Sequence, residues 1–556
     1  MEILRGKGAS GGIVSGVMRF YKREGLDVQK RTVEDRAKEK ERFGRARELA
    51  GAQLSELMES TAQKLGKENA QLFEMHQMML EDADFLDITE DLITNGGFNA
   101  EYAVQEASKQ LVQILTDSGD DYMMERAADV KDVTRRVTSI LLGKSSGVGQ
   151  LDEPSVLASN DFAPSETAEF EPGKVLALLT SGGALNSHTA IFARTMGIPA
   201  VIGLGAGLDE KLDGMSVVVD GSAGTVIVNP DGGTLEEYLR RRSEEDAKKE
   251  KLKALIGLEN KTLDGVTVEV CANIGGVDDA DLAVRNDACG IGLFRSEFLF
   301  LQNSSAPDEE SQFKAYKDVA EKMGGKRVVV RTLDIGADKQ VDYLNLDKEE
   351  NPALGLRAIR ICLNRPDLFK IQLRAIYRAS AFGKLAIMFP MIASLWEVKK
   401  AKEIAASVRR ELIAEGVKFD ETVEIGIMIE TPAAVMISDL LAAEVDFFSV
   451  GTNDLTQYTL AVDRQNEKLE RFFAADHPAL LRMLKIAADS IHRNGGWIGI
   501  CGELAANTAL TVTFMAIGID ELSVAPNQVL PLRETIRGLQ VSSLKPEILD
   551  SLKGLW

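Results

Sequence analysis

Hydrophobic and polar residues alternate in different ways along successive parts of this chain. From about residue 27 to 142, apolar residues recur at intervals of three and four, which predicts a series of helices. Short β-like runs stand before and after this region: they are Gly11–Phe20, Lys174–Leu179 and Ser216–Val219. The order predicts a small α/β domain, residues 1–25 and 145–230, into which a helical module, residues 26–144, is inserted.

The pattern changes beyond Leu263, where short β-rich runs alternate with helical stretches. The eight runs are Val266–Ile274, Gly290–Phe294, Arg327–Thr332, Leu385–Pro390, Glu424–Ile429, Asp446–Val450, Trp497–Ile500 and Glu521–Val524. Eight strands alternating with helices over roughly 290 residues match a β/α barrel, whose usual length is about 250 residues. We therefore expect a multidomain α/β protein in which residues 263–556 form an eight-stranded β/α barrel.

Residues 231–262, between these two regions, predict a connecting helix. Thr234–Glu237 has the sequence of a capping box, and thirteen of the eighteen residues from Glu236 to Lys253 are charged. A helix this polar is expected to be solvated over most of its surface. Because it separates two glycine-punctuated α/β regions, we expect it to act as the hinge between the two halves of the chain.

Composition limits the classes of function. A chain of 556 residues has room for three or four domains at about 150 residues each. The 65 Lys and Arg against 86 Asp and Glu give a formal charge of −21, which disfavours nonspecific binding to nucleic acid. The four cysteines show no C-x-x-C spacing, and no apolar run suits a signal peptide or a bilayer span. These features predict a soluble protein of the reducing cytoplasm.

Charged side chains gather directly after the predicted barrel strands, where a β/α barrel carries its chemistry. Arg295 and Arg331 follow the second and third strands, and a guanidinium can hold phosphate or carboxylate with two hydrogen bonds. Glu430 and Asp454 follow the fifth and sixth strands and offer the oxygen ligands that Mg²⁺ prefers. Cys501, taken alone, is best explained as a small buried residue, but its place in this ring favours a role in the site. Together they predict a magnesium-assisted site for a small anionic substrate.

A second centre is predicted in the N-terminal α/β domain. Asn186 and Ser187 follow a glycine turn and are capping residues for a short helix that ends near Gly197. His188 is then expected at a helix N-terminus, where free N–H groups and the helix dipole favour a phosphoryl group carried on the imidazole. The other three histidines lack this context.

Long stretches of the sequence resemble one family, the phosphoenolpyruvate-protein phosphotransferases, or enzyme I of the bacterial sugar phosphotransferase system. The segments that carry the resemblance are Asn186-Ser-His-Thr-Ala-Ile, Gly290-Ile-Gly-Leu-Phe-Arg-Ser-Glu-Phe-Leu-Phe, Glu350-Asn-Pro-Ala-Leu-Gly-Leu-Arg-Ala-Ile-Arg, Gly451-Thr-Asn-Asp-Leu-Thr-Gln-Tyr, Asp463-Arg464 and Cys501-Gly-Glu-Leu-Ala. It extends over essentially the whole chain, and runs of this length are far more specific than a single motif.

The resemblance implies a role for each residue singled out above. His188 would accept the phosphoryl group from phosphoenolpyruvate and pass it to a histidine of the small phosphocarrier protein. Cys501 would protonate the enolate to give pyruvate, and Glu430 and Asp454 would hold Mg²⁺. The substrate-binding residues implied by position are Arg295, Arg331, Asn453 and Arg464.

The resemblance also implies how the domains are used. The α/β domain would swivel so that its histidine reaches first the barrel and then the carrier protein. The helical module would be the surface on which the phosphocarrier docks, and the barrel would form a homodimer. The reaction would be the first step of sugar uptake by the phosphotransferase system.

The segment before His188 departs from the family pattern, which is commonly Gly-Gly-Arg-Thr-Ser-His. Here it reads Gly183-Ala-Leu-Asn-Ser-His188, so one glycine, the arginine and the threonine are replaced. Loss of the arginine removes a local contact to phosphate, and the way in which the phosphohistidine is stabilised stays open. Thr167 matches a family segment and would orient the imidazole through its hydroxyl, or else cap a helix.

Three other functions stay open at this point. A pyruvate phosphate dikinase or phosphoenolpyruvate synthase shares the histidine and the barrel, but it needs an additional ATP-binding domain that the first 150 residues do not suggest. A regulatory protein that senses phosphoenolpyruvate without catalysis would need neither the histidine nor both metal carboxylates. A magnesium-dependent lyase or aldolase would leave His188 without a role.

Overall fold

The chain folds into two compact units, Met1–Ala247 and Lys248–Trp556. The structure is a computed structural model. It describes residues 1–21, 25–65, 67–117, 121–144, 153–170, 173–185, 187–301, 305–336, 341–464, 466–474 and 476–553.

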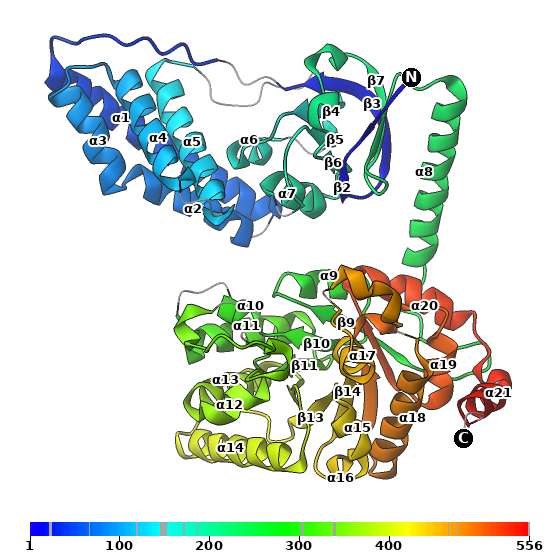
Figure 1. The fold of residues 1–556 in the computed structure, drawn as a ribbon. Coiled ribbons are helices and arrows are strands. Elements are labelled where there is room, and N and C mark those ends of the chain that lie inside the picture. The colour runs from blue at the N-terminus through cyan, green and yellow to red at the C-terminus, as the bar shows by residue number, and fades with distance from the viewer. Residues whose placement is uncertain are drawn as a thin grey trace. The chain divides into compact units, whose positions relative to one another are not determined.

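An eight-stranded mixed sheet organises the first unit (Figure 1). In spatial order its strands are β1 (Glu2–Arg5), β8 (Thr225–Val228), β7 (Ser216–Asp220), β3 (Ile13–Phe20), β4 (Ser155–Ser159), β5 (Val175–Thr180), β6 (Ala200–Ile202) and β2 (Lys7–Ser10). Strands β3 to β6 run parallel, and the three runs predicted as β correspond to β3, β5 and β7. The described α-helices beside this sheet are short: they are α6 (Pro164–Ala168) and α7 (His188–Met196). Ala190 and Phe192 of α7 are buried in a core that includes Leu178 of β5, which fixes α7 against the sheet.

In the described part of the segment between β3 and β4 the chain forms five helices, and the apolar spacing predicts a helical module there (Figure 1). They are α1 (Arg36–Leu65), α2 (Lys67–Leu80), α3 (Ala83–Thr94), α4 (Ala100–Thr116) and α5 (Asp121–Leu141). Their shared core contains buried aromatic residues such as Phe43, Phe73 and Phe85. His76 is fully buried in this module, with its Nε2 3.2 Å from Asp129 Oδ1, so it links α2 to α5. The predicted boundary at residue 145 lies outside the described residues.

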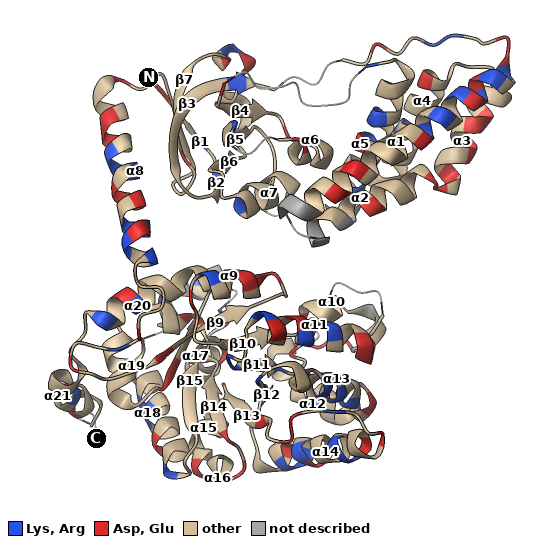
Figure 2. Ribbon diagram, turned by 180° about the vertical axis from the view of Figure 1, so that it is seen from behind, with Lys and Arg blue, Asp and Glu red and all other residues tan. Residues whose placement is uncertain are grey.

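The charged helix predicted between the two regions is α8 (Gly232–Lys253), and none of its residues is buried. Basic and acidic residues follow one another along it (Figure 2). The predicted cap is wrong, because the helix begins earlier and its first turn is capped by Asp231, whose Oδ1 accepts a hydrogen bond from the backbone N–H of Thr234 at 2.9 Å. A carboxylate caps a helix at least as well as a threonine hydroxyl, and its charge also favours the helix dipole.

The second unit contains a closed barrel of eight parallel strands, which confirms the predicted barrel. The strands are β9 (Glu269–Ile274), β10 (Ile291–Arg295), β11 (Val328–Arg331), β12 (Leu385–Phe389), β13 (Glu424–Ile429), β14 (Phe447–Val450), β15 (Trp497–Ile500) and β16 (Glu521–Val524). Each strand pairs with its neighbour in sequence, and β16 pairs with β9 to close the barrel. All eight predicted runs overlap these strands.

Helices alternate with the strands of the barrel (Figure 1). They are α9 (Asp279–Arg285), α10 (Phe298–Leu301), α11 (Glu309–Lys322), α12 (Ile359–Asn364), α13 (Pro366–Ala379), α14 (Leu395–Ala414), α15 (Pro432–Met436), α16 (Ser438–Ala442), α17 (Thr452–Leu460), α18 (Pro478–Arg493), α19 (Thr511–Ile517), α20 (Val529–Arg537) and α21 (Val541–Lys553). The largest core lies between these helices and the strands. Across the described part of the chain, no helix combines the length and the apolar composition needed to cross a bilayer.

A smaller core fills the inside of the barrel, where alternate residues of the strands point inward. Its members are Leu293, Val329, Ala386, Met388, Met428, Phe447 and Cys501. Trp497 stacks on Phe447 with ring centroids 4.5 Å apart, so the interior is packed with side chains and is not a pore.

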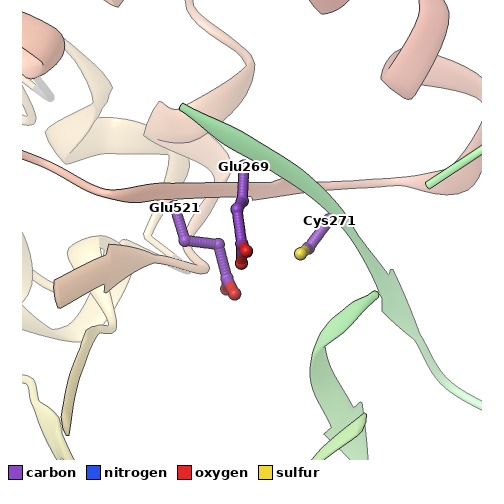
Figure 3. A group of neighbouring side chains, drawn as sticks. All are labelled: Glu269, Cys271 and Glu521. Atoms are coloured by element: carbon purple, nitrogen blue, oxygen red, sulfur yellow. The ribbon is translucent and has the colours of Figure 1, made fainter. Parts of the chain in front are cut away.

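At the amino-terminal end of the barrel, one guanidinium is held between two carboxylates. Arg327 Nη2 lies 2.5 Å from Glu269 Oε2 and 2.9 Å from Glu521 Oε2, and its guanidinium stacks 3.8 Å from the Trp497 ring. Glu269, Cys271 and Glu521 point toward one another, with ligand atoms within 4.8 Å (Figure 3). Because Arg327 already supplies the positive charge that these carboxylates need, we interpret the group as a structural ion pair at the end where barrels carry stability.

Replacing Glu521 with glutamine is expected to destabilise the barrel. The Glu521→Gln variant leaves the guanidinium of Arg327 with only Glu269, and we expect a loss of about 2 kcal/mol in the free energy of unfolding. The measurement is a denaturant unfolding curve of the barrel. The matched control is Asp489→Asn, which breaks a half-exposed pair with Lys485 and is expected to cost less than about 0.5 kcal/mol. Equal losses in the two variants would contradict this account.

Candidate active site

The structure brings the predicted barrel residues to one rim. Arg295 and Arg331 are the last residues of β10 and β11, Glu430 directly follows β13, and Cys501 directly follows β15. Asp454 lies in the first turn of α17, just after β14. Since the strands are parallel and the barrel is closed, these positions all lie at the carboxyl end of the barrel.

Arg331 is buried and held by two carboxylates. Its Nη2 lies 2.6 Å from Glu297 Oε1, and its Nη1 lies 2.9 Å from Asp334 Oδ2. Burial alone would lower the pKa of Arg331, but the carboxylates of Glu297 and Asp334 outweigh it and raise that pKa above its ordinary value. The guanidinium is therefore a fixed positive charge inside the rim.

Glu430 is a buried carboxylate whose environment favours a cation. Its Oε1 accepts a hydrogen bond from the backbone N–H of Met391 at 2.5 Å, and Met391 takes a positive φ of 56° to present that N–H. Burial and the negative charges of Asp334 and Asp454 raise the pKa of Glu430 to about 8. At Gly451, an added Cβ would come within 2.8 Å of Glu430 Oε2, so only glycine leaves this oxygen room.

Asn453, Asp454 and Arg464 lie beside one another after β14. Asp454 Oδ1 is 3.6 Å from Arg464 Nη2. Asn453 and Glu503 exchange two hydrogen bonds: the Asn453 amide donates to Glu503 Oε1 at 3.1 Å, and the backbone N–H of Glu503 donates to Asn453 Oδ1 at 3.2 Å. This pair ties the start of α17, after β14, to the 3-10 turn that follows β15.

The carboxylates of Glu430 and Asp454 fit a divalent cation. Both offer hard oxygen ligands and both are buried. Burial, and then neighbouring negative charges, raise the pKa of Glu430, and a cation would offset both effects. Two protein carboxylates leave other positions for water and substrate oxygens, as Mg²⁺ requires.

Cys501 is 2% exposed and its thiol is held at the rim. The Sγ–H points to the carbonyl of Val450 at 3.6 Å, and Asn273 donates a hydrogen bond to the Cys501 carbonyl at 2.9 Å. Burial raises the pKa of Cys501 to about 11, although the nearby charge of Arg331 acts in the opposite direction. The thiol therefore stays protonated at neutral pH.

Arg295 stands apart from the buried groups, because its side chain is exposed at the rim. Its positive charge acts to lower the pKa of Cys501, in the opposite direction to burial. An exposed cation at the mouth of the barrel can attract an anion that approaches from solvent.

His188 is the first residue of α7, at the helix N-terminus that the sequence predicts. Ser187 caps the helix by accepting a hydrogen bond from the backbone N–H of Ala190 at 3.4 Å, and Gly197 ends it with a left-handed φ of 65°. Arg194 donates to the carbonyl of Leu185 at 2.8 Å and so ties the helix to the loop before His188. Asn186, the other predicted capping residue, lies outside the described residues.

The hydroxyl of Thr167 shows neither of its two predicted roles, because α6 has Ala163 and Glu169 at its cap positions. Its hydroxyl donates to the carbonyl of Pro164 at 2.9 Å, within α6. The hydroxyl is therefore used inside its own helix and has no described contact with His188.

The sequence places Glu297 and Asp334 directly after predicted strands and Arg357 in a family segment, but it gave no role to these three buried charged residues of the rim. Arg357 Nη2 lies 2.9 Å from Asp334 Oδ1, so one aspartate bridges Arg357 and Arg331. Glu297 and Asp334 stand two and three residues beyond strand-end arginines, a position that could have suggested ion pairs. Asp338 and Lys339, which the sequence also places after this strand, lie outside the described residues.

Three family models match successive parts of the chain. They describe the amino-terminal domain of phosphoenolpyruvate-utilising enzymes at residues 5–126, their mobile domain at residues 151–224, and their phosphoenolpyruvate-binding domain at residues 249–541. His188 lies in the second match, and the barrel rim lies in the third.

Relatives match over nearly the whole chain. The proteins of Bacillus sp. (strain S) and Geobacillus stearothermophilus, both named phosphoenolpyruvate-protein phosphotransferase, are 42% identical over 555 residues, which cover 99% of this chain and 96% of each relative. The protein of the same name from Priestia megaterium is 40% identical over 546 residues, covering 98% of this chain and 95% of the relative.

The buried thiol of Cys501 is expected to resist alkylation. With a pKa of about 11 instead of 9.0, its thiolate fraction at pH 8 is about 100-fold below that of an ordinary thiol. We expect native Cys501 to react with iodoacetamide at least about 100-fold more slowly than Cys501 of the denatured protein, as measured by mass spectrometry of its peptide. Cys289, which is only half-buried, serves as the internal control and is expected to react faster. Equal rates for native and denatured Cys501 would contradict a buried thiol with a raised pKa.

Proposed function

Since this chain belongs to the phosphoenolpyruvate-utilising enzymes, and over its whole length to the phosphoenolpyruvate-protein phosphotransferases, we propose that His188 takes the phosphoryl group of phosphoenolpyruvate and passes it to a histidine of a small phosphocarrier protein. Phosphoryl transfer from phosphoenolpyruvate is the activity of the family. The observation that carries the residue assignment is the gathering of Arg331, Glu430, Asp454 and Cys501 at one barrel rim.

Four residues bind the substrate in this proposal. Phosphoenolpyruvate carries a phosphate and a carboxylate. The carboxylate offers two oxygens in one plane and the phosphate three terminal oxygens, and a guanidinium can donate two hydrogen bonds to either group. The residues are Arg295, Arg331, Asn453 and Arg464. The fixed positive charge of Arg331 and the exposed cation of Arg295 support this role, because one is preorganised and the other meets solvent.

Glu430 and Asp454 would hold Mg²⁺ in this proposal. When bound, the ion neutralises charge on the phosphate and orients its oxygens. Support comes from the burial of both carboxylates: burial first, and then the charges of Asp334 and Asp454, raise the pKa of Glu430 to about 8.

Cys501 is the proton donor in this proposal. As the imidazole nitrogen of His188 bonds to phosphorus, the bond from phosphorus to the enol oxygen breaks, and the enolate keeps the electron pair. Carbon 3 of the enolate then takes the proton of the Cys501 thiol to give pyruvate, and solvent returns a proton to the thiolate. The pKa of about 11 supports this role, because a donor must hold its proton at neutral pH.

The two reacting groups belong to different compact units. His188 lies in Met1–Ala247 and the barrel rim in Lys248–Trp556. Transfer therefore requires that the two units approach during the reaction, and the charged helix α8, which spans the division between them, is the proposed hinge. At the start of α7 the free backbone N–H groups would stabilise the phosphoryl group on His188.

Both the helical module and the barrel bind partners in this proposal. The helical module of residues 26–144 is the docking surface for the phosphocarrier, and exposed apolar residues such as Leu49 and Met78 give it contact area. The barrel of residues 263–556 forms a homodimer, for which exposed Trp396 and Met436 are available. The reaction is the first step of sugar uptake in the cytoplasm, a reducing location that suits four unpaired cysteines.

Pyruvate formation distinguishes this function from its alternatives. Without a carrier, each chain is expected to release about one equivalent of pyruvate from phosphoenolpyruvate and stop; with a phosphocarrier, release becomes continuous. The burst requires a divalent cation, and Glu430→Gln is expected to slow it by about 100-fold or more. Lactate dehydrogenase and NADH measure the pyruvate.

The control is Glu521→Gln at the other end of the barrel, which is expected to keep the burst. Continuous pyruvate release without a carrier would indicate a lyase, and no release at all would indicate a binding protein. Either result contradicts the proposed function.

A further inference from the structure

We propose that Asp334 is a positioning residue that fixes the orientation of two guanidiniums: that of Arg331, which binds the substrate in the proposed function, and that of Arg357 beside it. The inference deepens the proposed function and rests on it. Asp334 itself has no assigned part in substrate or metal binding above, although it stands at the centre of the rim's ion pairs.

The geometry is a bridge through one carboxylate. Asp334 Oδ2 lies 2.9 Å from Arg331 Nη1, and Asp334 Oδ1 lies 2.9 Å from Arg357 Nη2. The side chain of Asp334 is 5% exposed, and each arginine side chain is 10% exposed. Each carboxylate oxygen therefore fixes one guanidinium, and a single rigid group sets the spacing of two cations.

A backbone hydrogen bond holds the segment that carries Asp334 beside the segment that carries Arg357. The backbone N–H of Ala358, next to Arg357, donates to the carbonyl of Ile335, next to Asp334, at 3.0 Å. Ala358 has a φ of 53° and a ψ of −126°, a conformation that is costly for a residue with a Cβ. The fold thus accepts local strain at the position that brings Arg357 to Asp334.

Secondary contacts orient each guanidinium further. Glu297 holds the second Nη of Arg331 at 2.6 Å, and the Arg357 Nη1 donates to the hydroxyl of Tyr458 at 3.5 Å. Among the described residues, the Nε of each of these two arginines is buried and has no hydrogen-bond partner. A buried donor without a partner costs free energy, and an anionic ligand beside the pair would offset part of it.

Electrostatics explains why the bridge must be a carboxylate. Two neighbouring guanidiniums repel each other, and burial strengthens the repulsion because solvent screens it less. One negative charge between them cancels much of that cost.

Two substitutions at Asp334 separate positioning from charge. Asp334→Glu keeps the charge but moves it by one methylene, so the carboxylate cannot meet both guanidiniums where they now lie. Asp334→Asn keeps the length but removes the charge. The wild type and both variants are compared in the full chain with Mg²⁺, phosphoenolpyruvate and a phosphocarrier, for kcat, KM and thermal midpoint.

We expect kcat to fall by about 100-fold in Asp334→Glu, while KM for phosphoenolpyruvate changes less than about threefold and the thermal midpoint stays near that of the wild type. Asp334→Asn is expected to lose kcat to a similar extent and to melt earlier. The matched control is Glu521→Gln, a buried paired carboxylate far along the strands, whose kcat is expected to stay within about twofold of the wild type.

A kcat of Asp334→Glu within about threefold of the wild type would overturn the inference, because charge alone would then suffice. Failure of Asp334→Glu to fold would also overturn it, since the carboxylate would then serve the fold instead of the site. If the wild type forms no pyruvate, the proposed function itself fails; if the wild type and Asp334→Glu are equally active, only the inference fails.

Discussion

The balance of charges inside a closed barrel is the constraint on which the rest of the structure depends. Eight parallel strands bring eight carboxyl ends to one rim, so residues far apart in the sequence, such as Arg331 and Cys501, are buried in the same small volume. A buried ion is costly unless an opposite charge lies beside it. The rim meets this constraint by interleaving arginines with carboxylates.

The two ends of the barrel neutralise their buried charges with opposite arrangements. At the amino end, the guanidinium of Arg327 lies between Glu269 and Glu521, and stacking on an indole completes its burial. At the carboxyl end, the carboxylate of Asp334 lies between two guanidiniums. Glu430 is a further buried carboxylate at this end; burial, and then the charges of Asp334 and Asp454, raise its pKa, and a bound cation would favour its charged form.

Much of this architecture could be predicted from the sequence. The eight strands follow from short apolar runs at regular spacing, because both faces of a parallel strand are buried. His188 at a helix start follows from local glycine and serine signals. The link between Asp334 and Arg357 was missed, because residues 23 positions apart meet only through the strained turn at Ala358. The protonated state of Cys501 was also beyond the sequence, since it depends on burial by the whole barrel.

The central claim is that His188 carries a phosphoryl group derived from phosphoenolpyruvate. The most direct measurement is intact-mass spectrometry under neutral or alkaline conditions after incubation with phosphoenolpyruvate and Mg²⁺. The account predicts one added phosphoryl group per chain, lost on acid treatment and absent from His188→Ala. An unmodified mass in the wild type, or an equal adduct in His188→Ala, would contradict it.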